Sequence, residues 1–73
     1  MTTHVLHSFQ KNTVEQVQAS ITTYKGKEYA DIRAYYQTSD GEWRPTKKGI
    51  CLGFDLLDEL EIAVQKLKKA TGV

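Results

Sequence analysis

Apolar and polar residues alternate along the first half of the chain, and this alternation predicts β-strands. From Val14 to Tyr24, apolar or small residues alternate with polar ones, which indicates a strand with one buried face. Residues 28–36 repeat the pattern, with alanine and isoleucine on one side and tyrosine, aspartate and arginine on the other. Gly26 lies between the two segments and supplies the backbone freedom that a hairpin turn needs.

Two shorter strands are expected after a second turn. Residues 38–41 read Thr-Ser-Asp-Gly, and Asp-Gly favours a hairpin. Residues 42–44 begin a third strand that Pro45 interrupts, so we expect this strand to be short or to lie at an edge. Residues 48–52 predict a fourth strand, with an isoleucine and a leucine on its buried face.

The period changes at residue 54, and residues 54–70 predict one amphipathic helix with apolar residues spaced by three and four. Asp55 is expected to cap its start and Gly72 to end it. A membrane-surface helix is an alternative, but the acidic residues near its start would be repelled by anionic lipid. The apolar stripe is broader than one small sheet can cover. We therefore expect a second copy of the chain to cover it, through contacts at Leu57, Leu60, Val64 and Leu67.

These elements predict an α+β fold, with a four-stranded antiparallel sheet and one C-terminal helix. We expect a single domain over residues 13–73, preceded by a flexible tail or short strand over residues 1–12. Seventy-three residues are close to the lower limit for a self-sufficient core, so oligomerisation is expected. Cys51 is the one cysteine and cannot form an internal disulfide, and no apolar run approaches the roughly 20 residues of a membrane span. We expect a protein of the cytoplasm, nucleoid or nucleus that is not secreted.

Catalysis and metal binding are not expected. The sequence shows no nucleophile–base pair, no paired carboxylates in a pocket-forming context and no phosphate-cradling loop, so we expect neither an enzyme nor a cofactor. His4 and His7 lie three residues apart, but no further ligand completes a metal site, and two exposed histidines are the simpler interpretation. Cys51 has no plausible base beside it and is expected to pack.

Basic and aromatic residues are concentrated in residues 24–52. This stretch holds six of the ten Lys and Arg residues and five of the seven aromatic residues. The net charge of +1 favours no partner, but residues 1–53 carry seven basic and five acidic side chains, against three and four in residues 54–73. A sheet that presents both cations and rings fits the phosphates and bases of an unpaired nucleic-acid strand.

Three segments of this stretch together resemble a known family. They read Tyr24-Lys25-Gly26-Lys27, Asp31-Ile32-Arg33-x-Tyr35-Tyr36 and Gly41-Glu42-x-Arg44-Pro45-x-Lys47-Lys48-Gly49-Ile50-x-Leu52. With the order of strands and helix, they resemble the single-stranded-DNA-binding C-terminal domain of the transcriptional coactivator positive cofactor 4, in the short form found in bacteria and their phages. The resemblance covers about residues 17–70.

The resemblance implies a homodimer of curved four-stranded sheets that are joined through their C-terminal helices, with single-stranded DNA held on each sheet. It implies base stacking by Tyr24 and Tyr36, where the family often has Phe and Trp. It implies mostly DNA-backbone contacts by the basic residues Lys25, Lys27, Arg33, Arg44, Lys47 and Lys48. The implied processes are transcription regulation or DNA replication, recombination and repair, with transcription or replication proteins as further partners.

Several alternatives stay open at the level of sequence. Tyr36 has the wrong parity to share a face with Arg33, unless a β-bulge or a strong twist intervenes. Asp31 lies on the same side of the strand as Arg33, so a structural ion pair is a competing role for that arginine. Trp43 fits either a third stacking platform or a dimer contact. RNA binding, or a dimeric module that docks an acidic partner protein, are the alternative functions.

Overall fold

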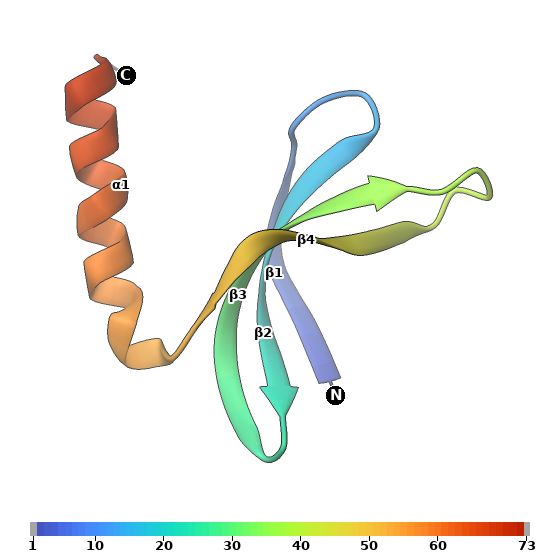
Figure 1. Cartoon of the computed structure of the whole chain (residues 1–73), viewed down its shortest axis with the longest axis horizontal. Helices are drawn as coiled ribbons and strands as arrows, with labels where there is room; N and C mark the ends of the chain where they lie inside the picture. Colours follow the sequence, from blue (N-terminus) through green and yellow to red (C-terminus); the bar gives the residue numbers. More distant parts are fainter. Residues whose placement is uncertain (1, 73) are drawn as a thin grey trace.

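The chain forms one open antiparallel sheet followed by a helix (Figure 1). The computed structural model describes residues 2–72. The sheet has the strand order β1-β2-β3-β4. The elements are β1 (Thr2–Gln10), β2 (Glu15–Tyr24), β3 (Lys27–Gln37), β4 (Trp43–Leu52), the 3-10 turn η1 (Phe54–Leu56) and α1 (Leu57–Thr71). The predicted α+β class, with four antiparallel strands and a C-terminal helix, is confirmed.

The central pair of strands follows the predicted alternation. The register between β2 and β3 runs without a shift from Glu15 opposite Tyr36 to Tyr24 opposite Lys27. Because residues that face each other across a ladder share a side of the sheet, this register defines two faces. The apolar face carries Val17, Ala19, Ile21, Ala30, Ile32 and Ala34, and β4 adds Ile50 and Leu52. The polar face carries Gln16, Gln18, Ser20, Thr22, Tyr24, Lys27, Tyr29, Asp31, Arg33 and Tyr35.

The outer strands differ from the prediction. Residues 42–44 and 48–52, expected as separate strands, belong to the single strand β4. Pro45 is tolerated inside it because β4 lies at the edge of the sheet, where no other strand formed by residues 2–72 needs the missing N–H. The remaining strand is β1, so residues 1–12, expected as a tail or short strand, include a nine-residue strand, and eight of its residues pair with β2.

The helix ends as predicted but begins differently. Asp55 does not cap it: Asp55 lies within η1, and Leu56 occupies the N-cap position with no side-chain hydrogen bond. Gly72 ends the helix with a left-handed φ of 75°, and its N–H donates to the carbonyl oxygen of Lys68. Within residues 2–72, no helix has the length and apolar character needed to cross a membrane.

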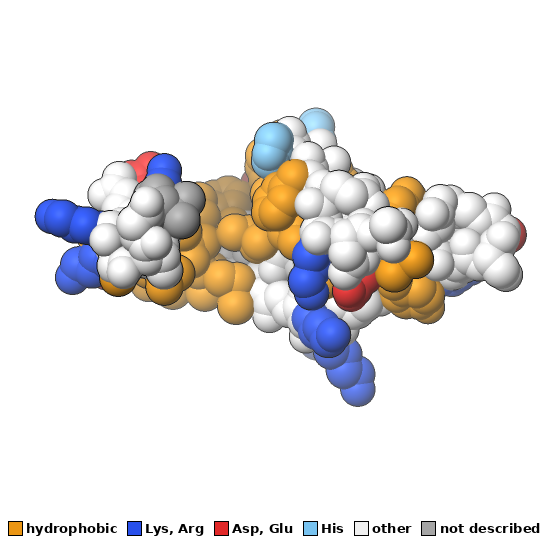
Figure 2. Space-filling model, turned by 90° about the horizontal axis from the view of Figure 1, so that it is seen from above, with side chains coloured by type: hydrophobic (Ala, Val, Ile, Leu, Met, Phe, Trp, Pro, Cys, Tyr) orange, Lys and Arg blue, Asp and Glu red, His pale blue; other side chains and the backbone are white. Residues whose placement is uncertain are grey.

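Helix α1 lies beside the sheet, and η1 connects the two (Figure 1). No residue of the helix is buried, and Leu67 is 65% exposed. Among the described residues, Ala34 is the one buried hydrophobic side chain. Figure 2 shows hydrophobic side chains gathered on the surface between the helix and the sheet. A single copy of the chain therefore leaves many large apolar side chains exposed to water.

Candidate nucleic-acid interface

The β2–β3 turn places an open aromatic ring beside two lysines. Lys25 and Gly26 form the turn with φ values of 52° and 77°. The Nζ atom of Lys25 lies 5.4 Å from the centre of the Tyr24 ring, within range of a cation–π contact. Tyr24 is 52% exposed, and Lys27 lies opposite it on the polar face. One face of the ring is thus associated with a cation, and much of the ring remains open to solvent.

Arg33 is held by the protein itself. Its Nε atom lies 3.2 and 3.3 Å from the carboxylate oxygens of Asp31, and its Nη2 atom lies 2.9 Å from Oδ1 of the same residue. Its Nη1 atom donates to the carbonyl oxygen of Thr46 at 3.0 Å. The hydrogen bond to Asp31 raises the pKa of Arg33 above its ordinary value. The structure therefore contains the ion pair that was the competing explanation for this arginine.

A bulge in β4 displays two lysines. Arg33 faces Gly49 and Tyr35 faces Pro45, so one residue of β3 lies opposite the three residues 46–48. The Thr46 hydroxyl donates to the carbonyl oxygen of Ala34 at 2.8 Å and accepts from the N–H of Lys48 at 3.1 Å. These bonds anchor residue 46 to β3, while the two lysines that follow it are exposed.

The two lysines of the bulge have different surroundings. Lys47 lines a hollow on the polar face together with Arg33. Lys48 lies near Glu15: the hydrogen bond from Asn12 and, to smaller extents, the charges of Lys11 and Lys48 hold the pKa of Glu15 below its ordinary value. Glu15 pairs with Tyr36, near the C-terminal end of β3.

Two of the predicted residues lie on the other face of the β2–β3 ladder. The bulge that could have changed the parity of Tyr36 is in β4, whereas the pairing of β3 with β2 is unbroken. Tyr36 therefore shares a side with Ala34 and not with Arg33. Arg44 lies opposite Tyr36, and its Nη2 atom pairs with Glu42 at 3.0 Å.

The structure thus divides the predicted site residues into two groups. Tyr24, Lys27, Arg33 and Lys47 lie on the polar face, and Lys25 lies in the adjoining turn. Tyr36 and Arg44 lie on the other side, with Lys48 toward Glu15.

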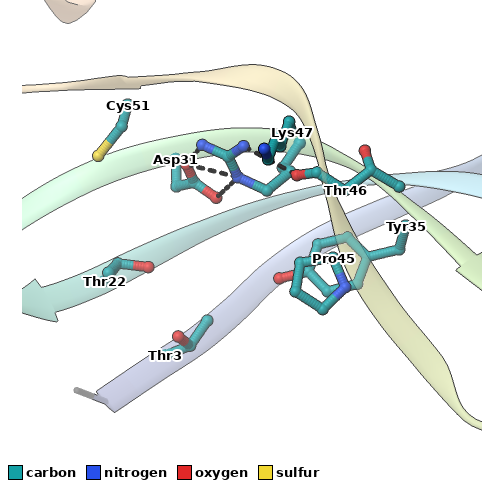
Figure 3. A pocket seen from close by; sticks show the side chains of 9 residues that line it. Thr3, Thr22, Asp31, Tyr35, Pro45, Thr46, Lys47 and Cys51 are labelled. Atoms are coloured by element: carbon teal, nitrogen blue, oxygen red, sulfur yellow. Dashed lines mark hydrogen bonds and ion pairs between the residues drawn. The ribbon is translucent and has the colours of Figure 1, made fainter.

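A hollow of about 490 Å³ opens on the polar face (Figure 3). It is lined by Thr3, Thr22, Asp31, Arg33, Tyr35, Pro45, Thr46, Lys47 and Cys51. Two of these residues, Tyr35 and Pro45, are cross-strand partners that line one part of it side by side. Neither was among the predicted site residues. The signal that could have identified Tyr35 is its position two residues after Arg33, on the same side of an alternating strand.

Metal-binding side chains do not cluster in the described part of the chain. Residues 2–72 contain no group of three or more His, Cys, Asp or Glu side chains that could hold a metal ion. His4 and His7 are exposed on β1. Cys51, which was expected to pack, is instead exposed at the edge strand with a free thiol.

Comparisons with known proteins agree with this fold. Residues 11–63 match the model of a family described as Transcriptional Coactivator p15 (PC4). The structure is similar to a PC4 homologue from Burkholderia pseudomallei in two crystal forms. The orthorhombic form gives a TM-score of 0.77 at 28% identity, covering 93% of this chain and 88% of that one. The tetragonal form gives 0.80 at 27% identity, covering 96% and 98%.

A third similar structure comes from a bacteriophage. It is the phage T5 homologue of the eukaryotic coactivator PC4, described as implicated in recombination-dependent DNA replication. The TM-score is 0.76 at 23% identity, covering 100% of this chain and 84% of that one. At this identity the likeness concerns the fold.

Proposed function

Because the chain belongs to the PC4 family of transcriptional coactivators, we propose that it binds single-stranded DNA as a homodimer. The DNA-dependent processes that it would serve are transcription, replication, recombination or repair. The observation that carries this proposal is that Tyr24, Lys27, Arg33 and Lys47 lie on one face of an open sheet, where Arg33 and Lys47 line a hollow. An unpaired strand needs cations along its backbone and flat surfaces for its bases, and this face offers both.

The lysines are the phosphate-binding groups in this proposal. Lys25, Lys27 and Lys47 are exposed, and their ammonium groups make no ion pair among residues 2–72. The charge of Arg33 is paired with Asp31, and the group also donates to the Thr46 carbonyl, so Arg33 contributes less to phosphate binding than the unpaired lysines do. Tyr24 is the stacking ring that its exposure and its neighbouring cation favour.

The apolar surface that one copy leaves uncovered supports the proposed homodimer. Phe54, Leu57, Val64 and Leu67 are between 39% and 65% exposed, on η1 and along the helix. A second hollow, lined by Leu6, Ala19, Ser20, Ile21, Ala30, Ile32, Phe54 and Leu57, continues this surface onto the apolar face of the sheet. Burial of such side chains contributes about 1.5–3 kcal/mol each, which is large beside the stability of a 73-residue domain. The proposed interface residues are Leu57, Leu60, Val64 and Leu67.

Fluorescence anisotropy with labelled oligo-dT and a matched duplex, over a salt series, tests the DNA-binding proposal. We expect tighter binding to oligo-dT and a log–log salt slope of about −0.7 per neutralised phosphate. Lys27→Ala should weaken binding and make the slope shallower by about that amount. Lys69→Ala, which removes a cation from the helix instead of the sheet, is the matched control and should leave the slope unchanged.

Three results would redirect the proposal. Tighter binding to oligo-rU than to oligo-dT would favour RNA. Absence of binding to any nucleic acid at low salt would reject the proposal and favour a module that docks an acidic protein. A single species of 8.3 kDa in sedimentation at micromolar concentration would reject the homodimer.

A further inference from the structure

We propose that the hollow on the polar face is a pocket for one unstacked nucleobase, with Tyr35 as its stacking wall and Arg33 as its hydrogen-bond donor. The inference rests on the proposed binding of single-stranded DNA and adds to it a base-reading site that the sequence did not predict. The lining residues come from all four strands, so the hollow belongs to the folded sheet and not to one flexible loop.

The size and lining of the hollow suit a base. Its volume of about 490 Å³ falls in the range of about 300–1,000 Å³ that is usual for small-ligand sites. Tyr35 offers an aromatic ring, and Pro45 lies beside it as its cross-strand partner (Figure 3). A rigid proline beside the ring limits the positions that the ring can adopt, which prepares it for stacking at low entropic cost. Threonine hydroxyls at positions 3 and 22 add groups that both donate and accept.

Arg33 contributes donors that are held in place. A guanidinium has five N–H groups. In Arg33 the Nε–H and one N–H on Nη2 bond to Asp31, and one N–H on Nη1 bonds to the Thr46 carbonyl. Two of the five N–H groups therefore remain, one on Nη1 and one on Nη2, and neither has an acceptor among residues 2–72. Because Asp31 and Thr46 fix the plane of the group, these two donors keep a constant direction at the wall of the hollow.

Fixed donors favour a base with carbonyl oxygens. Thymine, guanine and cytosine carry such oxygens, whereas adenine carries ring nitrogens and an amino group that is itself a donor. The pocket is therefore expected to prefer thymine or guanine to adenine. Lys47 lines the same hollow and is exposed, and in this proposal it contacts the phosphate next to the bound base.

The test separates base contacts from phosphate contacts. Binding is measured to oligo-dT, to oligo-dA and to an oligonucleotide of the same length in which abasic sugars replace the nucleosides. Tyr35→Leu should weaken binding to oligo-dT by about 5- to 140-fold, as loss of one stacked base predicts, and leave binding to the abasic strand unchanged. It should also reduce the preference for oligo-dT over oligo-dA. Tyr35→Phe, which keeps the ring, should bind like the original protein.

Lys27→Ala is the contrasting variant, because it should weaken binding to oligo-dT and to the abasic strand equally. A second measurement uses the unaltered protein with ring-labelled tyrosine: oligo-dT, but not the abasic strand, should shift the NMR signals of the Tyr35 ring. Equal losses on both strands for Tyr35→Leu, no loss on either, or an unmoved Tyr35 signal would overturn the base pocket while leaving DNA binding intact. Failure of the unaltered protein to bind either strand would overturn the proposed function and the pocket together.

Discussion

Replacing Gly49 by alanine tests how closely β4 approaches β3 at the bulge. A Cβ atom at this position would lie 2.6 Å from the carbonyl oxygen of Ile32, 2.8 Å from the Cα atom of Arg33 and 2.9 Å from its Cβ atom. Side-chain carbons do not approach non-bonded atoms this closely. The neighbours are backbone atoms of β3 and the Cβ atom attached to that backbone, which cannot rotate away, so the strands must move apart. Gly49 is not among the glycines with positive φ, so crowding is the reason for the expected loss.

The expected effect is a net loss of about 1–2 kcal/mol in the free energy of unfolding. Overpacking a close contact costs about 1–3 kcal/mol, and restriction of the unfolded chain by Gly→Ala returns about 0.4–1 kcal/mol. For a domain of this size, each 1 kcal/mol corresponds to about 4–8 °C in Tm. Gly49→Ala should therefore lower Tm by about 4–16 °C.

Gly53→Ala is the matched control for this measurement. Gly53 has a φ of −64°, and its closest neighbour would be the Oδ1 atom of Asp55, at the far end of a side chain that can rotate away. Thermal unfolding followed by circular dichroism, at one fixed protein concentration, compares the two variants. We expect the control to retain the original Tm or rise slightly. Equal Tm values for the two variants would refute the argument that the strands are in contact at Gly49.

Three further predictions follow from other parts of the structure. Leu67→Ala should raise the dimer dissociation constant at least 100-fold, because two copies of a leucine each lose about 1.5–3 kcal/mol of burial; an unchanged constant in sedimentation would place Leu67 outside the interface. Asp31→Asn should lower the free energy of unfolding in urea by about 1.5–3 kcal/mol, because the half-buried Arg33 loses its charged acceptor; a change below 0.5 kcal/mol, roughly the effect of a surface substitution, would contradict this. The pKa of Glu15 in the folded protein is lowered, first by the hydrogen bond from Asn12. The ionised Glu15 therefore contributes its full stabilisation above the ordinary pKa of 4.5, and this stabilisation is lost as the pH falls through the lowered pKa of the folded state. Glu15→Gln should flatten the acid side of the stability profile below that pH, and a profile parallel to that of the original protein would show that the hydrogen bond has no such effect.

The parts of the fold that the sequence predicted are those in which one local pattern decides the outcome. Strands β2 and β3 alternate cleanly because each has one apolar face, and Gly72 ends the helix because only glycine adopts its left-handed conformation without strain. Strand β1 was underestimated because its alternation is interrupted: Val5 and Leu6 are adjacent apolar residues, and a bulge between Val5 and His7 shifts the register.

The site was predicted less completely because its geometry depends on contacts between strands. The side of the sheet on which Tyr36 lies is decided by which strand carries the bulge, and the bulge is held by Thr46 and Gly49 against β3. No local pattern in β3 carries that information. Pro45 was interpreted as an interruption for the same reason, because its tolerance depends on the position of β4 at the edge of the sheet.

DNA binding and dimerisation, the two parts of the proposed function, depend on each other because the molecule contains a single layer of sheet. The chain measures 39 × 35 × 19 Å, and its helix extends beside the sheet instead of covering it. A sheet with an apolar face must bury that face against another layer. If the second copy of the chain supplies this layer through its helix, the polar face stays open, with its lysines, the ring of Tyr24 and the hollow beside Tyr35 available to a DNA strand. A dimer that covered the polar face instead would leave the apolar face in water and bury unpaired lysines, and both changes are unfavourable. Substitutions in the helix should therefore weaken DNA binding only as far as they reduce the fraction of dimer. Substitutions on the polar face should weaken DNA binding and leave the fraction of dimer unchanged.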